Sequence, residues 1–406
     1  MLSTPTDLPA PRIERHGRYT LSSHVIPAPS PRLTPHIDQP IFVDKTRASQ
    51  AVEAIITGRR EVIKFGTPNT HHLWNCVNRY VSNRVGQGLT FVFVPGNGIP
   101  KETYEPAVQH LISASPGLVD EVWMWESVFQ GDSGVLNAGK LGGAYNWEDD
   151  TRDLLEFLKH YLPPRVSRNP LPDDLSSIRI DEKEVSNRIR NGFSSRKIVL
   201  VGHSYGGCIS ALAALQYPTL FHSLVLIDPI IVPPRHFDSG AGKKLMTSFM
   251  KGSLLRQSTW MNWTIAEECL RQYRPYQSWD SAAFDRLILH GLRVNEVDSQ
   301  VHLKTSSINE TVLYADPITP SMVYGLLHQL DAGIQLDWVL PENGGIIGPS
   351  LTQKMIGLRP VNTKSVMIPG TSHFIPQDRP KDFGKYFNSL VLKKVLMTIQ
   401  RTQYYN

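Results

Sequence analysis

One short motif constrains the fold more than any other part of the chain. The sequence Gly-His-Ser-Tyr-Gly-Gly occupies residues 202–207, after the apolar run 197–201 and before the Ala- and Leu-rich segment 208–215. This order predicts a buried strand, a sharp turn and a helix, and the turn matches the pattern Gly-x-Ser-x-Gly. Small residues flank such a serine because strand and helix lie too close together for larger side chains. Ser204 is therefore expected to project from the carboxyl edge of a sheet.

Strand and helix patterns alternate on both sides of this motif. The other predicted strands are apolar runs at residues 61–65, 90–94, 122–125, 223–227 and 364–368. The other predicted helices lie at residues 104–113, 147–161 and 380–397. Regular alternation of this kind predicts an α/β fold with a doubly wound, mostly parallel sheet.

The chain divides into four predicted parts. Residues 1–45 carry many prolines and no sustained periodicity, so we expect an extended or partly disordered strap without a chemical role. Residues 46–232 form the first part of an α/β core, which residues 336–406 complete. Residues 233–335 combine helical segments with several Trp and Tyr residues, which predicts an inserted helical lid whose aromatic side chains mostly build its own core.

Length and composition limit the class of protein. A chain of 406 residues can hold one large α/β domain with an insertion, or two ordinary domains. No apolar run approaches the roughly 18 residues that span a membrane, so we expect no stable membrane insertion. The net charge of +5 is mild and the Lys and Arg residues are scattered, which argues against a nucleic-acid partner. The oligomeric state is left open.

Cysteine usage and the chain ends bear on the compartment. Cys76, Cys208 and Cys269 are too few and too far apart for a disulfide framework or a thiolate metal site. Residues 1–16 are polar and rich in proline, which argues against a secretory signal, and the final Tyr-Tyr-Asn is not a peroxisomal Ser-Lys-Leu address. We therefore expect an intracellular, cytoplasmic protein.

A base and an acid must accompany Ser204 if its hydroxyl is to act as a nucleophile. His373 follows the last predicted strand, and glycine at position 370 lets its loop bend back toward the serine. Asp228 ends the strand after the Ser204 helix and is the first candidate for the acid, although it could simply cap the turn before Pro229. The acid more commonly follows the strand after the lid, but no Asp or Glu follows the apolar residues at 344–349. Glu342 is the reserve candidate. His203 is expected to pack below the nucleophile.

Acyl chemistry also needs backbone donors for the developing oxyanion. The first donor is expected to be the backbone amide of Tyr205, directly after the serine. The second is expected from the glycine-containing loop after strand 90–94, with Asn97 and Ile99 both possible. A phosphate-binding loop is the rival interpretation, but this loop lacks both glycine-rich phosphate-binding spacings.

These residues together resemble the α/β-hydrolase superfamily from about residue 60 to the end. Residues 96–106, the Gly-Asp-Ser at 131–133, Asn137 and Trp147 further resemble the fungal toxin-biosynthesis hydrolases. That group includes the acyl-CoA hydrolase of mycophenolic acid biosynthesis, whose acid follows the strand after the elbow. The resemblance therefore implies the same role for Asp228, and a setting in a fungal secondary-metabolite pathway.

We expect a serine hydrolase that cleaves an ester or a thioester, possibly linked to coenzyme A, without a metal or an organic cofactor. A large aromatic lid suggests an apolar pocket for a bulky polyketide- or terpenoid-derived acyl group. A C–C hydrolase, an acyltransferase or a cyclase would use the same residues. A ligand-binding protein without turnover is the alternative from another class, and it predicts a damaged triad.

Overall fold

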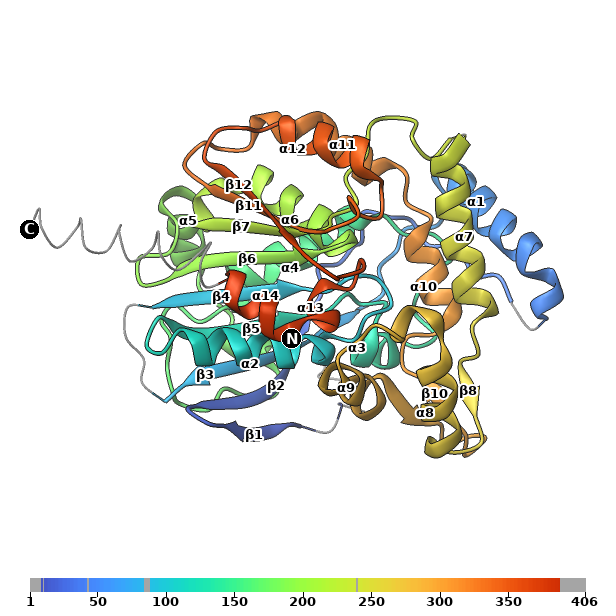
Figure 1. Ribbon diagram of the computed structural model, residues 1–406, viewed down its shortest axis with the longest axis horizontal. Helices are drawn as coiled ribbons and strands as arrows, with labels where there is room; N and C mark the ends of the chain where they lie inside the picture. The colour runs from blue at the N-terminus through green and yellow to red at the C-terminus, as the bar shows by residue number, and fades with distance from the viewer. Residues whose placement is uncertain (1–8, 10, 42–43, 84–87, 239, 388–406) are drawn as a thin grey trace, which may run out of the picture.

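A large sheet runs through the molecule and carries the predicted site residues at one edge. The computed structural model describes residues 9, 11–41, 44–83, 88–238 and 240–387. Within them, nine strands form this sheet in the order β1-β2-β3-β5-β4-β6-β7-β11-β12 (Figure 1). The strands are β1 (Ile13–His16), β2 (Tyr19–Pro27), β3 (Trp74–Ser82), β4 (Leu89–Val94), β5 (Val119–Trp125), β6 (Lys197–His203), β7 (Ser223–Ile227), β11 (Gln335–Pro341) and β12 (Thr363–Ile368).

The pairing directions divide the sheet into two parts. Strands β1, β2, β3 and β5 pair antiparallel, whereas β5, β4, β6, β7, β11 and β12 pair in parallel. This arrangement confirms the predicted α/β fold with a mostly parallel sheet. The parallel part brings the carboxyl ends of β4, β6, β7 and β12 to one edge, which is where ligands bind in sheets of this type.

Helices cover both faces of the sheet, which explains why its central strands are continuously apolar. In β6, Ile198 and Leu200 face one core while Val199 and Val201 face the other, and β7 alternates in the same way. The helices that pack around the core are α1 (Ala48–Phe65), α2 (Glu105–Ala114), α3 (Gly131–Leu136), α4 (Trp147–Glu156), α5 (Glu182–Asn191), α6 (Tyr205–Gln216), α12 (Pro349–Gly357), α13 (Ile375–Asp378) and α14 (Pro380–Phe387).

Most of the segment between β7 and β11 lies at one end of the molecule, on the right in Figure 1. Its helices are α7 (Gly240–Leu255), α8 (Trp263–Gln272), α9 (Ser281–Gly291), α10 (Ser307–Tyr314) and α11 (Ile318–Leu326). It also contains a small antiparallel sheet of β8 (Thr259–Trp260), β10 (Val301–Leu303) and β9 (Leu292–Val294), which the sequence patterns did not predict. The lid boundaries at 233 and 335 stay a prediction.

Two sequence predictions differ from the structure. Residues 61–65 were expected to form a strand but are the last turns of α1. Their buried Val62 continues a row of buried residues at helical spacing, Ala48, Ala51, Val52 and Ile55, and no strand pairs with them in the described chain. Residues 13–27, expected as a strap, form β1 and β2 at the antiparallel edge of the main sheet. The predicted end of the last helix, beyond Phe387, lies outside the described residues.

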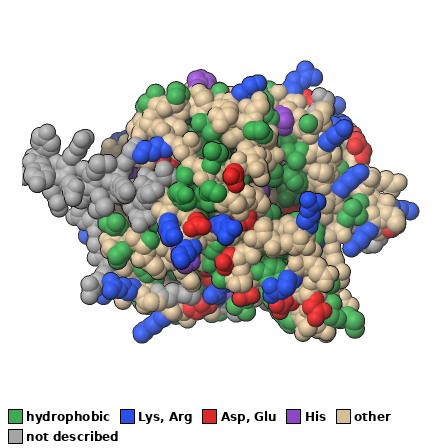
Figure 2. Space-filling view, in the orientation of Figure 1, with side chains coloured by type: hydrophobic (Ala, Val, Ile, Leu, Met, Phe, Trp, Pro, Cys, Tyr) green, Lys and Arg blue, Asp and Glu red, His purple; other side chains and the backbone are tan. Residues whose placement is uncertain are grey.

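The surface shows no strong separation of charge in the view of Figure 2, where basic and acidic side chains are interspersed. In the portion of the chain that the structure describes, every helix is too short or too polar to cross a membrane.

A buried ion cluster ties strands together at the sheet edge opposite the predicted site. Glu121 in β5 accepts hydrogen bonds from Arg196, just before β6, and from Arg79 in β3, the latter at 2.7 Å. Arg196 also donates to the hydroxyl of Thr90 in β4 at 3.2 Å. Burial alone would raise the pKa of the Glu121 carboxyl, but the two guanidinium groups outweigh burial and lower it. Glu121 is therefore held as an anion between two cations.

We expect Glu121→Gln to lower the free energy of unfolding by about 3–5 kcal/mol, because it leaves two buried guanidinium groups without a counter-charge. Because the folded-state pKa lies below its ordinary value of 4.5, the stabilisation is present above that pH and is lost as the pH falls below it. Urea denaturation at several pH values measures both effects. Glu182→Gln, which removes an exposed ion pair with Arg179, is the control and should change stability by less than about 0.5 kcal/mol.

Candidate active site

Ser204 occupies the turn between β6 and α6 with a backbone conformation that is rare for a residue with a side chain. Its φ is 58° and its ψ is −123°. Three backbone hydrogen bonds hold it there: its amide donates to the Ile227 carbonyl at 2.9 Å, and its carbonyl accepts from Gly207 at 3.0 Å and Ile230 at 3.1 Å. Such strain persists only where the surroundings enforce it, and it is common at functional sites.

The glycines around Ser204 are required by close backbone contacts. A Cβ atom on Gly202 would collide with the Gly206 carbonyl oxygen, and one on Gly206 would collide with the carbonyl oxygens of Val94 and Pro95. A Cβ atom on Gly207 would lie 2.7 Å from the Cβ atom of Pro229. The strand–turn–helix geometry predicted from the motif is therefore present, for the predicted steric reason.

His373 and Asp228 meet at the same edge of the sheet. The Nδ1 atom of His373 lies 2.6 Å from Oδ2 of Asp228. Asp228 follows β7 and has a positive φ of 37°, and its amide donates to the carbonyl of Val339 in β11 at 2.9 Å. The Asp228 side chain is 1% exposed, whereas that of His373 is 15% exposed and reaches the pocket. A buried carboxylate on Nδ1 orients the ring and leaves Nε2 available for proton transfer.

The loop after β11 supports Asp228 rather than supplying the acid itself. The Ile346 amide donates to Oδ2 of Asp228 at 3.1 Å, and Gly345 lies so close to Oδ1 that a Cβ atom there would collide with it. Glu342, the reserve candidate, instead accepts from the Gly370 amide at 3.2 Å. The structure therefore brings Asp228 to His373 and leaves Glu342 at the base of the His373 loop.

His203 connects the site to its support through a buried hydrogen-bond chain. The Nε2 atom of His203 lies 2.8 Å from the His373 carbonyl oxygen, and its Nδ1 lies 2.6 Å from the Tyr104 hydroxyl. Burial and the neighbouring His373 ring lower the pKa of His203 well below its ordinary value, so the ring is neutral. A carbonyl can only accept, so Nε2 carries the proton and Tyr104 donates to Nδ1. The expected place of His203 below the nucleophile is consistent with this geometry. Tyr104 belongs to the stretch 96–106 of the family resemblance and begins a predicted helix, but neither signal predicts its contact with His203.

The loop after β4 lies against the serine. The Gly96 amide donates to the Tyr104 hydroxyl at 3.0 Å, and a Cβ atom on Gly96 would lie 3.3 Å from that of Ser204. The Ile99 amide donates to the Gly96 carbonyl at 3.3 Å, so it is already engaged in the turn. Of the two donors predicted from this loop, the Asn97 amide is the one without a hydrogen-bond partner among the described residues.

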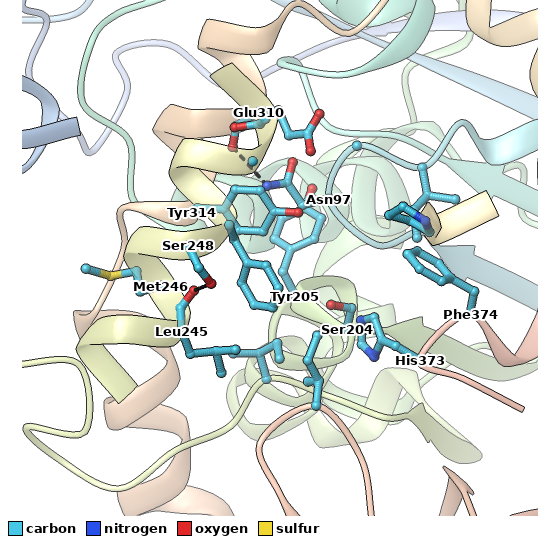
Figure 3. A pocket seen from close by; sticks show the side chains of 18 of the residues that line it. Asn97, Ser204, Tyr205, Leu245, Met246, Ser248, Glu310, Tyr314, His373 and Phe374 are labelled. Carbon is cyan, nitrogen blue, oxygen red and sulfur yellow. Dashed lines mark hydrogen bonds between the residues drawn. The ribbon is translucent and has the colours of Figure 1, made fainter. Parts of the chain in front are cut away.

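A pocket of about 340 Å³ opens over these groups. Ser204, Tyr205 and His373 lie on its core side, and α7 and α10 supply much of the opposite wall (Figure 3). Apolar and aromatic side chains dominate this lining, including Ile230, Phe237, Leu245, Met246, Phe249, Tyr273, Tyr276, Tyr314 and Phe374. No cluster of His, Cys, Asp and Glu suited to a metal ion occurs in the described ranges. The lining of the pocket therefore suits an apolar ligand.

Known proteins resemble this chain in sequence and in fold. Residues 91–385 match the profile of the alpha/beta hydrolase family. Type I acyl-CoA thioesterase mpaH of Penicillium brevicompactum is 29% identical over 224 residues, which cover 53% of this chain and 44% of that protein. Abhydrolase domain-containing protein ACTT2-1 of Alternaria alternata is 29% identical over 215 residues, which cover 46% of this chain and 79% of that protein. The chain thus spans less than half the length of the thioesterase.

A solved structure shares the fold over nearly the whole chain. The peroxisomal alpha-beta-hydrolase Lpx1 of Saccharomyces cerevisiae gives a TM-score of 0.67 at 19% identity, covering 94% of this chain and 91% of that one. At this identity the likeness concerns the fold alone.

We expect Gly206→Ala to destabilise the protein by about 1–3 kcal/mol, because the added methyl group must displace the backbone of β4 or of the turn. Thermal or urea unfolding measures the change. Gly357→Ala, at the end of α12 where a Cβ atom meets nothing within 4 Å, is the matched control and should leave stability unchanged or slightly higher. Equal stability of the two variants would contradict the steric account of the turn.

Proposed function

The chain belongs to the alpha/beta hydrolase family, and on that premise we propose that it hydrolyses an acyl ester or thioester through Ser204, His373 and Asp228. The observation that carries the proposal is the 2.6 Å contact between His373 and Asp228 beside a strained serine in one apolar pocket. A buried acid, a base and a nucleophile beyond strand ends at one edge of the sheet are the parts that acyl transfer requires.

In the proposed reaction, the Ser204 hydroxyl attacks the acyl carbonyl while His373 takes its proton at Nε2. The imidazolium that forms is stabilised by the Asp228 carboxylate, which accepts from its Nδ1. The backbone amides of Tyr205 and Asn97 receive the oxyanion; Tyr205 is the first residue of α6, where amides have no partner within the helix. His373 then protonates the leaving thiol or alcohol. Water, activated by the same base, cleaves the acyl-enzyme and restores Ser204.

The proposed substrate class is a bulky apolar acyl thioester or ester. The apolar pocket lining supports a large hydrophobic acyl group. The similarity to a protein named as an acyl-CoA thioesterase supports a thioester. The fungal sources of these relatives are consistent with the proposed setting in a fungal secondary-metabolite pathway.

An active-site fluorophosphonate should label the protein, and Ser204→Ala should abolish both labelling and turnover. Ser248→Ala provides a matched control, since Ser248 lines the same pocket on the lid side, and it should retain labelling. A screen with acyl-CoA, carrier-linked thioester and oxyester substrates then identifies the bond that is cleaved. A folded protein that neither reacts with the phosphonate nor turns over any ester would refute the activated serine and favour a ligand-binding role.

Replacement of the two candidate acids should give very different results. Asp228→Asn should lower kcat on the order of 10⁴-fold, because the amide cannot stabilise the imidazolium and favours the wrong tautomer of His373. Glu342→Gln should retain most of the activity, since Glu342 contacts the Gly370 amide. Steady-state kinetics on the best substrate measure both, and the reverse order of effects would assign the acid to Glu342.

A further inference from the structure

The lid side of the pocket contains a buried ion pair that the proposed reaction does not use. Arg256 follows α7 and donates from Nη2 to Oε2 of Glu310, in α10, at 2.5 Å. Each side chain is only 7% exposed, and both residues line the pocket. Figure 3 shows Glu310 and Tyr314 on the other side of the pocket from His373 and Phe374. The apolar pocket therefore has one strongly polar place, away from the base.

The guanidinium group of Arg256 keeps one donor unused. Its Nε atom is buried and has no hydrogen-bond acceptor among the residues that the structure describes. A buried donor without an acceptor is costly, and most such donors in folded proteins are satisfied. Asp316, the other carboxylate in the lining, is by contrast engaged by Arg59 at 2.7 Å and Thr319 at 2.6 Å. Among the described residues that line the pocket, Arg256 alone has a buried side-chain donor without an acceptor.

The charge balance at this place selects the kind of ligand group. Glu310 already neutralises Arg256, so a ligand carboxylate would meet a second carboxylate within the same low-dielectric pocket. A neutral oxygen, such as a hydroxyl, a phenol or a ketone, accepts from Nε without this repulsion. A hydroxyl or a phenol can also donate to Glu310.

The pair also adjoins the proposed oxyanion loop. The carboxyl carbon of Glu310 lies so close to Gly98 that a Cβ atom there would be 2.7 Å away, and the Glu310 carbonyl accepts from the Asn97 side chain at 3.0 Å. A ligand held at Arg256 therefore shares a wall with the residues that would bind the reacting carbonyl. The phosphates of a coenzyme A leaving group would meet the Glu310 carboxylate at this place, so we take the acyl group as the part that reaches Arg256.

We propose that Arg256 determines substrate specificity by binding a neutral oxygen on the acyl group, so that the pocket prefers oxygenated acyl chains or rings to plain hydrocarbon ones. The proposal rests on the proposed function for the nature of the scissile bond. It adds the chemical class of the acyl group, which the serine, histidine and aspartate do not determine.

Two matched series of N-acetylcysteamine thioesters test it: ω-phenylalkanoyl and ω-(4-hydroxyphenyl)alkanoyl compounds of equal chain lengths. Calorimetry with Ser204→Ala measures binding without turnover. At the chain length that fits, the phenol should bind about 10- to 100-fold more tightly than its unsubstituted partner. In Ser204→Ala/Arg256→Lys this preference should fall several-fold, because lysine keeps the ion pair to Glu310 but does not present a donor at the position of the Arg256 Nε atom.

Arg271→Lys in the same background is the matched control, since Arg271 forms an exposed ion pair with Glu267 in α8. It should keep the preference. Equal affinity of the two series at every length, or a preference that Arg256→Lys leaves unchanged, would overturn the proposal. The Arg256→Met/Glu310→Leu variant provides a second measurement if lysine alone perturbs folding, because it replaces the buried ion pair by apolar side chains of similar volume and leaves no charge unpaired. It should lose the preference.

Turnover by the protein with Ser204 intact separates this proposal from the proposed function. Hydrolysis of both series with equal affinity would support the proposed hydrolase function and refute the role of Arg256. A preference in binding without hydrolysis of either series would support the role of Arg256 and refute the proposed hydrolase function.

Discussion

The active-site geometry depends on hydrogen bonds that continue beyond the ends of the parallel strands. Ser204 and Asp228 both have positive φ angles without being glycines, and each follows one of two neighbouring strands. The Ser204 amide is held by Ile227 of the next strand, and the Asp228 amide by Val339 of the strand after that. The sheet thus extends its ladder by one residue across three strands. These hydrogen bonds help to hold the backbone of both residues in its strained conformation.

Much of this arrangement follows from sequence because it depends on local sterics and strand order. The glycines beside Ser204 are demanded by contacts within one strand–turn–helix unit, so the motif alone predicts them. Parallel strands place their carboxyl ends at one edge, so Asp228 and His373 are both expected there once β7 and β12 are recognised as strands. The loop before His373 crosses the end of β11 to bring the two side chains together. Of the two candidate acids, the structure places Asp228 beside His373.

The features that sequence could not predict depend on contacts between distant segments. Ile99 seemed as suitable a donor as Asn97, but its amide donates to the Gly96 carbonyl. The residue types indicate a turn at this place without predicting which of its amides is used within it. Residues 61–65 are a different case, because the apolar spacing from Ala48 to Val62 is helical and visible in the sequence, whereas five residues taken alone have strand-like composition. The partner of Arg256 is 54 residues away in the chain. Only the packing of α7 against α10 brings these two side chains together in the pocket.

The chain from Gly96 through Tyr104 and His203 to the His373 carbonyl joins the two sides of the candidate active site. Tyr104 and His203 each accept from one neighbour and donate to the next, so the direction of both protons is fixed by the Gly96 amide at one end and the His373 carbonyl at the other. Loss of the Tyr104 hydroxyl would leave both the Gly96 amide and Nδ1 of His203 without a partner. This one hydroxyl therefore couples the position of the loop after β4 to that of the His373 loop.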